Sequence, residues 1–462
     1  RNRSPPTIFH GSQLNHVGIS PNSSYVGDIM RLASSAPTDQ LISATFSFIT
    51  LFIREKIIMS DRLLVVSTDC HAGLPIHQYK PYVETKYHDF IDMAVDIQVD
   101  MMNKAEKQFL IKEINDEWRA PIEQELTGAW DYQERKKMLA KDGIAAEIVF
   151  PDGITEHNTP PFGAGLGLSP RDAVPELQWA GAMAHNRWLA ELVANDPKRH
   201  LGVASIPLLF DVDQAIEAVR WCAENGLKGV MLPTLWGDHA PYHDKKYDPF
   251  WEVCQDLGIF IHFHSGPAPL NEYFGPDFPN EDRSESLPGA MGCYVSEVMF
   301  WLYRPLTFML WGGVFERFPK LKAMVVEGGT LFMVPSWLRL LDHNYTDVHF
   351  SAKLGDFRSH LSMAPSEYFA RNCGIGASCV PRRDLEMKDV IGVNQIMWGS
   401  DYPHPEGTWP HTQQYYTDTF KGFPQEDGKL ILGLNAVDFY GLDGSYLRTL
   451  ADEIGPSSSI FQ

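Results

Sequence analysis

The chain has 462 residues, of which 44% are hydrophobic and 21% are charged, a composition typical of a globular protein with a sizeable core. Its 39 basic and 59 acidic residues give a formal net charge of −20. This acidity argues against a nucleic-acid partner and against an anionic membrane surface, and it leaves a small-molecule substrate as the expected partner. The six cysteines are scattered without a CxxC pair, which predicts reduced thiols and a cytoplasmic location.

The first 58 residues differ from the rest of the chain. They are rich in Ser, Asn and Pro and show no clear period, so 1–58 is predicted as a disordered or non-native extension that ends before Met59. The apolar run 41–53 is too short to span a bilayer. It also lacks the flanking features of a signal peptide.

From Met59 onward, short β-branched runs alternate with helical stretches. This alternation predicts parallel strands joined by crossover helices. Eight such units favour an α/β fold, a distorted (β/α)8 barrel over 59–445 with a C-terminal tail at 446–462. The predicted strands are Leu63–Thr68, Ile144–Phe150, Leu201–Ile206, Lys228–Leu232, Ile259–His264, Lys322–Glu327, Tyr368–Cys373 and Gln395–Ser400.

Capping signals between the strands predict helices over 211–225, 248–257 and 305–318. Residues 77–140 and 267–300 are longer than a single crossover requires, and the first of them contains a charged helical stretch at 93–118. We expect both to be insertions at the C-terminal face of the barrel, where they would shape a substrate pocket.

Chemically active side chains follow several of the predicted strands. Asp69 and His71 are two residues apart, so an extended chain directs both to the same side, and His262 and His264 repeat this spacing on the fifth strand. Carboxylate and imidazole ligands suit Zn²⁺, Mn²⁺ or Fe²⁺. His264 is the expected ligand, and the deeper His262 is a second ligand, a supporting partner or a substrate contact. The alternative for each residue is an ordinary turn-capping or hydrogen-bonding role.

Three more candidates end the sixth and eighth strands. Glu327 closes a buried apolar run, which predicts a proton-transfer or ligand role, or else an ion pair in the barrel wall. Asp401 lies where a carboxylate can contact both a metal and an attacking water, with a turn-forming role as the alternative. His404 could contact substrate or metal.

Weaker candidates follow other strands and are expected at the mouth as substrate contacts or rim residues. They are Asp152, His157, Trp236, His239, His243, Arg371 and Asn372, of which His157, Trp236 and Arg371 are the predicted substrate contacts. An aromatic set suggests an apolar ligand or ordinary packing, and it comprises Trp236, Phe263, Tyr294, Trp301, Tyr402 and Trp409.

The segments Ser67-Thr-Asp69-Cys-His71 and Gly399-Ser-Asp401-Tyr-Pro-His404 resemble the amidohydrolase superfamily, in particular its branch of aminocarboxymuconate semialdehyde and resorcylate-type decarboxylases. The resemblance runs from about Leu64 to Leu442. It implies a divalent metal held by Asp69, His71, His264 and Asp401, with Zn²⁺ expected ahead of Mn²⁺ or Fe²⁺, and a possible homodimer. The chain departs from that branch at Glu327, where the best-known members carry His-Gly-Gly.

The leading functional expectation is a mononuclear metal-dependent hydrolase acting on a C–N or C–O bond. Asp401 would act as base, Glu327 would protonate the leaving group, and His404 would assist. The alternatives are a non-oxidative decarboxylase of an aromatic or enoic acid, a dinuclear oxygenase on the same fold, and a non-catalytic barrel.

Overall fold

Eight parallel strands follow one another around a single sheet in the order β1-β2-β3-β4-β5-β6-β7-β8. The structure, a computed structural model, describes residues 61–462 apart from 109–111, 153–157, 167, 172, 276–286, 329–330 and 347–350. The strands are β1 (Val66–Ala72), β2 (Ala146–Pro151), β3 (His200–Ser205), β4 (Gly229–Met231), β5 (Phe260–His264), β6 (Ala323–Val326), β7 (Cys373–Ser378) and β8 (Ile396–Gly399).

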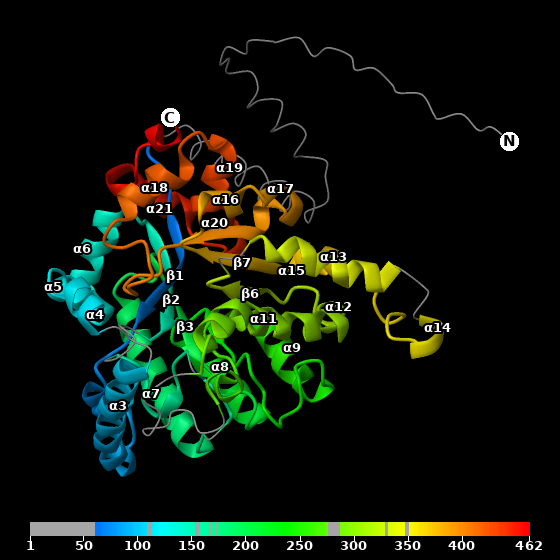
Figure 1. The fold of residues 1–462 in the computed structure, drawn as a ribbon, viewed down its shortest axis with the longest axis horizontal. Coiled ribbons are helices and arrows are strands. Elements are labelled where there is room, and N and C mark those ends of the chain that lie inside the picture. The colour runs from blue at the N-terminus through cyan, green and yellow to red at the C-terminus, as the bar shows by residue number, and fades with distance from the viewer. Residues whose placement is uncertain are drawn as a thin grey trace, which may run out of the picture. The chain divides into compact units, whose positions relative to one another are not determined.

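The sheet closes where the segment after β8 meets β1. The Asp401 amide donates to the Asp69 carbonyl at 2.9 Å, and the His71 amide donates to the Tyr402 carbonyl at 2.7 Å. These bonds complete a barrel with helices around it, as Figure 1 shows. The predicted (β/α)8 fold is therefore confirmed, and its closure brings Asp69 and His71 beside Asp401.

Helices connect the strands and surround the barrel. They are α3 (His88–Gln108), α4 (Lys112–Arg119), α5 (Glu123–Leu126), α6 (Tyr132–Asp142), α7 (Pro175–Ala194), α8 (Val212–Glu224), α9 (Asp248–Leu257), α10 (Leu270–Phe274), α11 (Ala290–Trp311), α12 (Val314–Arg317), α13 (Met333–Thr346), α14 (Ser351–Leu354), α15 (Pro365–Asn372), α16 (Arg382–Leu385), α17 (Lys388–Ile391), α18 (Thr412–Phe420), α19 (Gln425–Lys429), the π-helix η7 (Leu430–Leu434), α20 (Asn435–Tyr440) and α21 (Gly444–Ile454).

The helix ends follow the expected capping chemistry at several points. The Asp211 side chain accepts from the Gln214 amide at the start of α8, and α9 ends at Gly258 with φ 65°. The main core lies between these helices and the outward faces of the strands, where Phe263 and Trp398 are fully buried. The helices therefore cover the outer face of the barrel wall, and the inward-facing side chains near the mouth are available for binding and catalysis.

Two predicted elements differ from the structure. Residues 368–372 lie in α15 and β7 begins at Cys373, because Pro365 starts a helix in which the Glu367 carboxylate accepts from the Ala364 amide. Pro305 does not start a helix but lies inside the long α11, with α12 as a separate turn. The described residues of the charged stretch 93–118 lie in α3 and α4.

The C-terminal residues predicted as a tail pack on the barrel. The Leu63 amide donates to the Pro456 carbonyl at 2.8 Å, and the Gly422 amide donates to the Phe461 carbonyl at 2.9 Å. Phe461 is buried in the main core. The barrel unit therefore extends to the last residue, whereas the prediction for 1–58 lies outside the described residues.

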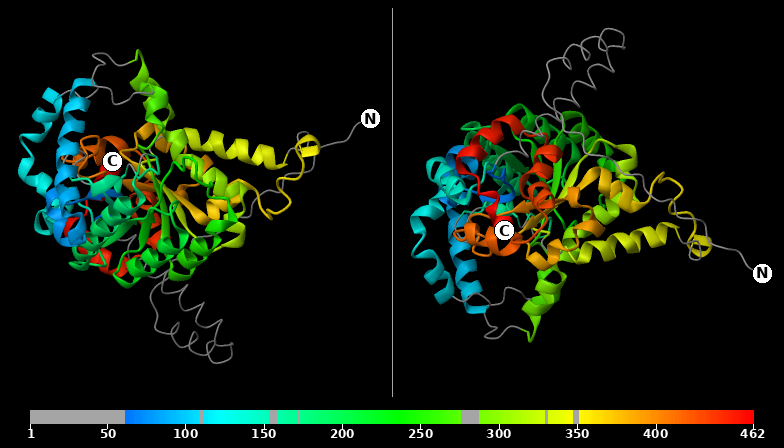
Figure 2. Two further views of the ribbon diagram at one scale, coloured as in Figure 1. Left: turned by 90° about the horizontal axis from the view of Figure 1, so that it is seen from below. Right: turned by 90° about the horizontal axis from the view of Figure 1, so that it is seen from above.

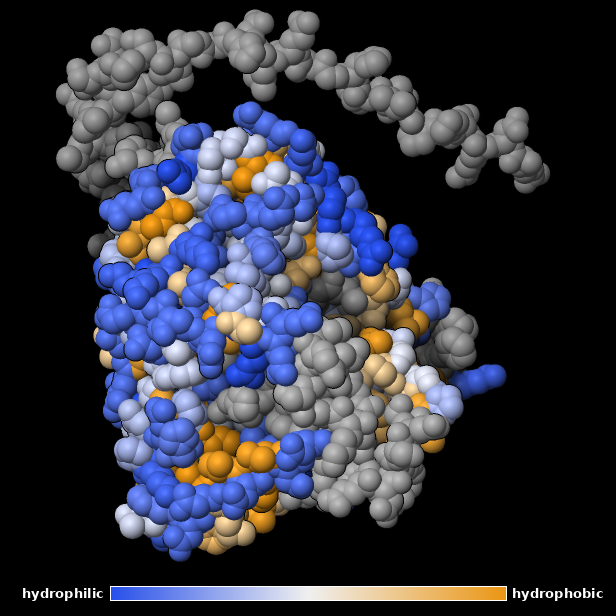
Figure 3. All heavy atoms as spheres, turned by 60° about the vertical axis from the view of Figure 1, so that its left-hand side comes forward, coloured by the Kyte–Doolittle hydropathy of each residue, from blue (hydrophilic) through white to orange (hydrophobic). Residues whose placement is uncertain are grey.

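The face of the molecule in Figure 3 is mainly hydrophilic over its described residues, with a hydrophobic patch near its lower end. Figure 2 shows that α13 projects away from the barrel. Within the described ranges, no helix combines the length and the apolar character needed to cross a membrane.

Candidate metal centre

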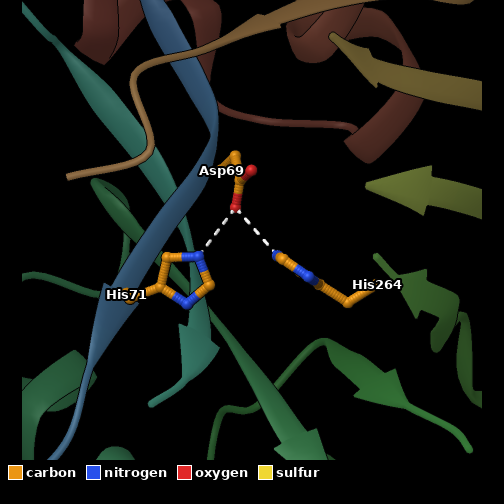
Figure 4. Close-up of side chains that lie close together, drawn as sticks. All are labelled: Asp69, His71 and His264. Carbon is orange, nitrogen blue, oxygen red and sulfur yellow. Dashed lines mark hydrogen bonds and ion pairs between the residues drawn. The ribbon is translucent and has the colours of Figure 1, made fainter. Parts of the chain in front are cut away.

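Asp69, His71 and His264 meet inside the mouth of the barrel. The Asp69 Oδ1 atom lies 3.2 Å from His71 Nε2 and 3.3 Å from His264 Nε2, as Figure 4 shows. The two imidazole rings meet edge to face with centroids 5.0 Å apart. All three side chains are buried. The side chains of β1 and β5 thus form one compact group of metal-ligand type.

The segment after β8 adds a second group that shares His71. Asp401 Oδ1 lies 3.1 Å from His71 Nε2 and 3.1 Å from His404 Nδ1. The His404 ring stacks on the His71 ring with centroids 4.0 Å apart. The predicted ligands of the first, fifth and eighth strands are therefore linked through one imidazole, with His264 on one side and Asp401 on the other.

The backbone is unusual where these side chains leave the strands. Asp152, Glu327, Cys379 and Asp401 follow β2, β6, β7 and β8, and all have positive φ, between 49° and 101°. Non-glycine residues rarely adopt this region, and when they do they cluster at functional sites. Four such turns at the same end of the barrel support the assignment of the mouth as the functional end.

Glu327 borders the cluster on its solvent side. Its carboxylate accepts a short hydrogen bond from the Ser265 hydroxyl and lies 3.8 Å from His264 Nδ1. The side chain is 28% exposed, whereas His264 and Asp401 are almost fully buried. Burial and the nearby Asp401 carboxylate raise the pKa of Glu327 to about 7. Glu327 can therefore exchange protons with solvent while touching the inner residues.

The inner carboxylates are held ionised by their imidazole neighbours. Burial alone would raise the pKa of Asp69, but His264 and His71 hold it well below its usual range. Asp401 likewise has a lowered pKa, because His404 and His71 outweigh its burial. Burial opposes protonation of His264 and His404, yet Asp69 and Asp401 raise their pKa values to about 9 and about 10. The cluster is therefore organised around two negative charges.

Several polar atoms in this cluster are buried without a hydrogen-bond partner among the described residues. They are His71 Nδ1, Asp401 Oδ2 and His404 Nε2. Orphaned buried polar atoms are costly unless a ligand satisfies them. A divalent cation would accept lone pairs from the imidazole and carboxylate atoms, so the residues present fit such an ion. Asp69, His71, His264 and Asp401 are the residues that would hold it.

Some predicted site residues lie elsewhere. His262 Nε2 is 2.9 Å from the Tyr440 hydroxyl of α20, and burial lowers the pKa of His262 to about 3, so this histidine is a neutral hydrogen-bonding residue deep in the barrel. Trp236 is buried with the Arg304 guanidinium 4.0 Å above its ring, and it leaves little surface for a substrate. His157 lies outside the described residues.

The expected position of Arg371 at the mouth is wrong. It lies in α15 before β7 begins, and its carbonyl accepts from Lys322, which precedes β6. Arg371 is therefore at the amino-terminal end of the strands, because the seventh strand starts later than predicted. Tyr402 and Trp409 do not form part of the expected aromatic rim. They pack with Cys70 in a separate buried cluster.

Sequence reasoning missed three supporting side chains. The Ser378 hydroxyl donates a short hydrogen bond to Asp69 Oδ2, and Ser265 supports Glu327. Glu406 joins Glu327 and Asp401 in a further, more exposed group of possible ligands. Ser378 could have been found as the polar end of the run Gly374-Ile-Gly-Ala-Ser378 once β7 was placed correctly.

A buried ion pair between α6 and β2 supports the candidate metal centre. Arg135 of α6 donates to both oxygens of Glu147 at 2.7 and 2.8 Å, and to the His71 carbonyl at 2.8 Å. Glu147 also lies 2.7 Å from His200 Nδ1. Burial would raise the pKa of Glu147, but Arg135 and His200 hold it well below its usual range. This cluster fixes the backbone of a predicted metal ligand.

Comparison with known proteins identifies the family. The family model described as Amidohydrolase matches residues 162–442. The chain belongs to the amidohydrolase family. It is 24% identical over 324 residues to the 2-amino-3-carboxymuconate-6-semialdehyde decarboxylase of Dictyostelium discoideum, a match that covers 69% of this chain and 78% of that relative. The predicted branch of the amidohydrolase superfamily is thereby confirmed.

Solved structures of two other proteins share the fold. An amidohydrolase from Mycobacterium avium subsp. paratuberculosis K-10 matches with a TM-score of 0.60 and 19% identity, covering 82% of this chain and 99% of that one. The 5-carboxyvanillate decarboxylase of Novosphingobium aromaticivorans, solved with bound manganese, matches with a TM-score of 0.57 and 15% identity over 83% of this chain and 98% of that one. At these identities the likeness concerns the fold.

Proposed function

We propose that this amidohydrolase-family protein is a metal-dependent, non-oxidative decarboxylase of a small aromatic or enoic carboxylic acid. The observation that carries the proposal is the position of Glu327, a solvent-reaching carboxyl beside a buried group of imidazoles and carboxylates of metal-ligand type. The decarboxylase named among the relatives supports this reaction over the hydrolysis that we expected first.

Decarboxylation requires a proton at the carbon that loses CO2. The bond between that carbon and the carboxylate breaks, and its electron pair forms a C–H bond with the incoming proton. Glu327 lies where it can give this proton, with the Ser265 hydroxyl orienting its carboxyl group. Because its side chain is partly exposed, Glu327 can recover the proton from water.

The inner residues have a holding role in this scheme. A divalent cation bound by Asp69, His71, His264 and Asp401 would supply positive charge to orient the anionic oxygens of the substrate. Ser378 and Arg135 keep Asp69 and His71 in position. His404, which contacts Asp401 and stacks on His71, keeps the Asp401 carboxylate oriented. We infer Mn²⁺ or Zn²⁺ as the cation.

The test is an activity screen in heavy water with a panel of hydroxybenzoic acids and enoic acids. A decarboxylase releases CO2 and leaves one deuterium on the carbon that carried the carboxylate. Glu327→Gln should lower this rate at least ~100-fold without loss of bound metal, because proton transfer typically contributes 10²–10⁴-fold. Incorporation of ¹⁸O from labelled water without CO2 release would instead identify a hydrolase.

A dinuclear oxygenase is the remaining alternative on the same fold. Glu327, Asp401 and Glu406 form a second group of possible ligands next to the buried ones, which is the observation that keeps this reading open. Two redox-active metals per chain and oxygen consumption would favour it over decarboxylation.

A further inference from the structure

A cavity of about 690 Å³ lies outside the barrel mouth. It is bounded by the C-terminal part of α11, by α12, by the segment before α9, and by residues 357–360. None of the residues of the candidate metal centre lines it. We call it the α11–α12 cavity. Its size falls in the range of small-molecule sites.

Aromatic rings form much of its wall. Trp311 and Phe357 meet edge to face with centroids 5.6 Å apart, and Phe308 lies 5.2 Å from the His243 ring. These three aromatic side chains are only partly buried. Rings that remain open to a cavity offer flat apolar faces on which a planar ligand can stack. The wall therefore favours an aromatic ligand over a flexible polar one.

One cation of the cavity has no partner in the described part of the chain, whereas the other charged groups do. Arg317 is already neutralised, because it donates to both oxygens of Asp248 at 2.9 and 2.8 Å. Glu316 accepts from the Ser362 hydroxyl at 2.8 Å and from the Tyr368 hydroxyl. The Lys245 ammonium group has no hydrogen-bond or ion-pair partner among the described residues, and neither has the His243 ring beside it.

An unpaired lysine in a cavity with aromatic walls can bind a carboxylate, since charge-assisted hydrogen bonds are the stronger kind. We propose that the α11–α12 cavity is a second small-molecule site, which takes a planar aromatic carboxylate of one or two rings. The rings of Phe308, Trp311 and Phe357 contact the ligand, and Lys245 pairs with its carboxylate.

The test is calorimetric titration of the full chain, loaded with Mn²⁺, with 2-naphthoate. Lys245→Gln should weaken one binding event at least ~10-fold, and Trp311→Ala should weaken the same event. Lys246→Gln is the matched control, because Lys246 neighbours Lys245 but lies over the Tyr247 ring at 4.7 Å and does not line the cavity. The neutral 2-naphthamide should bind more weakly than 2-naphthoate.

The proposal can fail independently of the proposed function. If Lys245→Gln and Lys246→Gln bind 2-naphthoate equally well, or if all binding disappears in Asp401→Asn, the cavity is not the site. Decarboxylation by Lys245→Gln should equal that of the unsubstituted chain. Loss of decarboxylation in Glu327→Gln with retained 2-naphthoate binding would support both proposals, and retained decarboxylation there would overturn only the proposed function.

Discussion

Replacing Arg135 with Met tests whether the ion pair behind the metal centre holds His71 in place. Arg135 is fully buried and donates to Glu147, to the His71 carbonyl and to the Gly128 carbonyl. Met fills similar space but removes the guanidinium that pairs with the Glu147 carboxylate, which keeps its contact with His200 Nδ1. Removing one partner of a buried pair typically costs 3–5 kcal/mol, so we expect about 4 kcal/mol.

This loss converts into a measurable shift in unfolding temperature. With an unfolding entropy of about 2.1 cal/mol/K per residue over roughly 400 residues, 4 kcal/mol corresponds to a fall of about 5 °C. The assay is thermal unfolding by circular dichroism together with the Mn²⁺ affinity of the folded protein. Affinity should fall about 10- to 100-fold, the usual effect of losing an outer partner of a metal ligand.

Two comparisons make this result specific. Arg383→Met removes a guanidinium that is 84% exposed and paired with Asp384, and it should change stability by less than about 1 kcal/mol. In a double-mutant cycle, adding Glu147→Gln to Arg135→Met should recover part of the loss, because the buried charge is then gone. Unchanged unfolding and unchanged Mn²⁺ affinity in Arg135→Met would refute the reasoning.

Two further perturbations test the electrostatics and the packing. Burial raises the pKa of Asp142 to about 7 from 3.8, so the stability contributed by this carboxyl is complete below about pH 4 and is lost as the pH rises through 7. The free energy of unfolding of Asp142→Asn should therefore exceed that of the unsubstituted chain by up to about 4 kcal/mol at pH 8 and by little at pH 4. Urea titrations at both pH values measure this difference, and an equal difference at pH 4 and pH 8 would contradict the prediction. Gly399→Ala places a Cβ 2.6 Å from the Asp69 Cβ and should weaken Mn²⁺ binding at least ~10-fold. Gly292→Ala is the control, because the space around Gly292 is open and its substitution should leave the Mn²⁺ affinity unchanged. Equal Mn²⁺ affinities of the two variants would refute the packing argument.

The sequence was most informative where chemistry and strand pattern coincide. Asp69, His264 and Asp401 each follow an apolar run, and parallel strands in a barrel bring such ends together. The seventh strand was misplaced because Cys373-Gly-Ile-Gly-Ala-Ser378 has few β-branched residues, whereas the preceding segment is apolar enough to imitate a strand. Pro365 indicates a helix start in this segment, because proline is favoured at the first helical position.

Other features depend on contacts that no local pattern can show. Ser378 reaches Asp69 across 309 residues of sequence, and Arg135 reaches the carbonyl of His71 from a different element. His262 and His264 have the same residue type and the same strand face, yet one turns to Tyr440 and the other to Asp69. The two histidines have different roles because His262 lies deeper in the barrel than His264. This difference in depth exists only in the folded protein.

The central claim is that imidazoles and carboxylates at the mouth hold one divalent cation through His71, which both buried ligand groups share. Elemental analysis after dialysis against Mn²⁺ tests it most directly. We expect about one ion per chain in the unsubstituted protein and almost none in His71→Ala, with both chains folded by circular dichroism. A full complement of metal in His71→Ala, or no metal in the unsubstituted chain, would contradict the account.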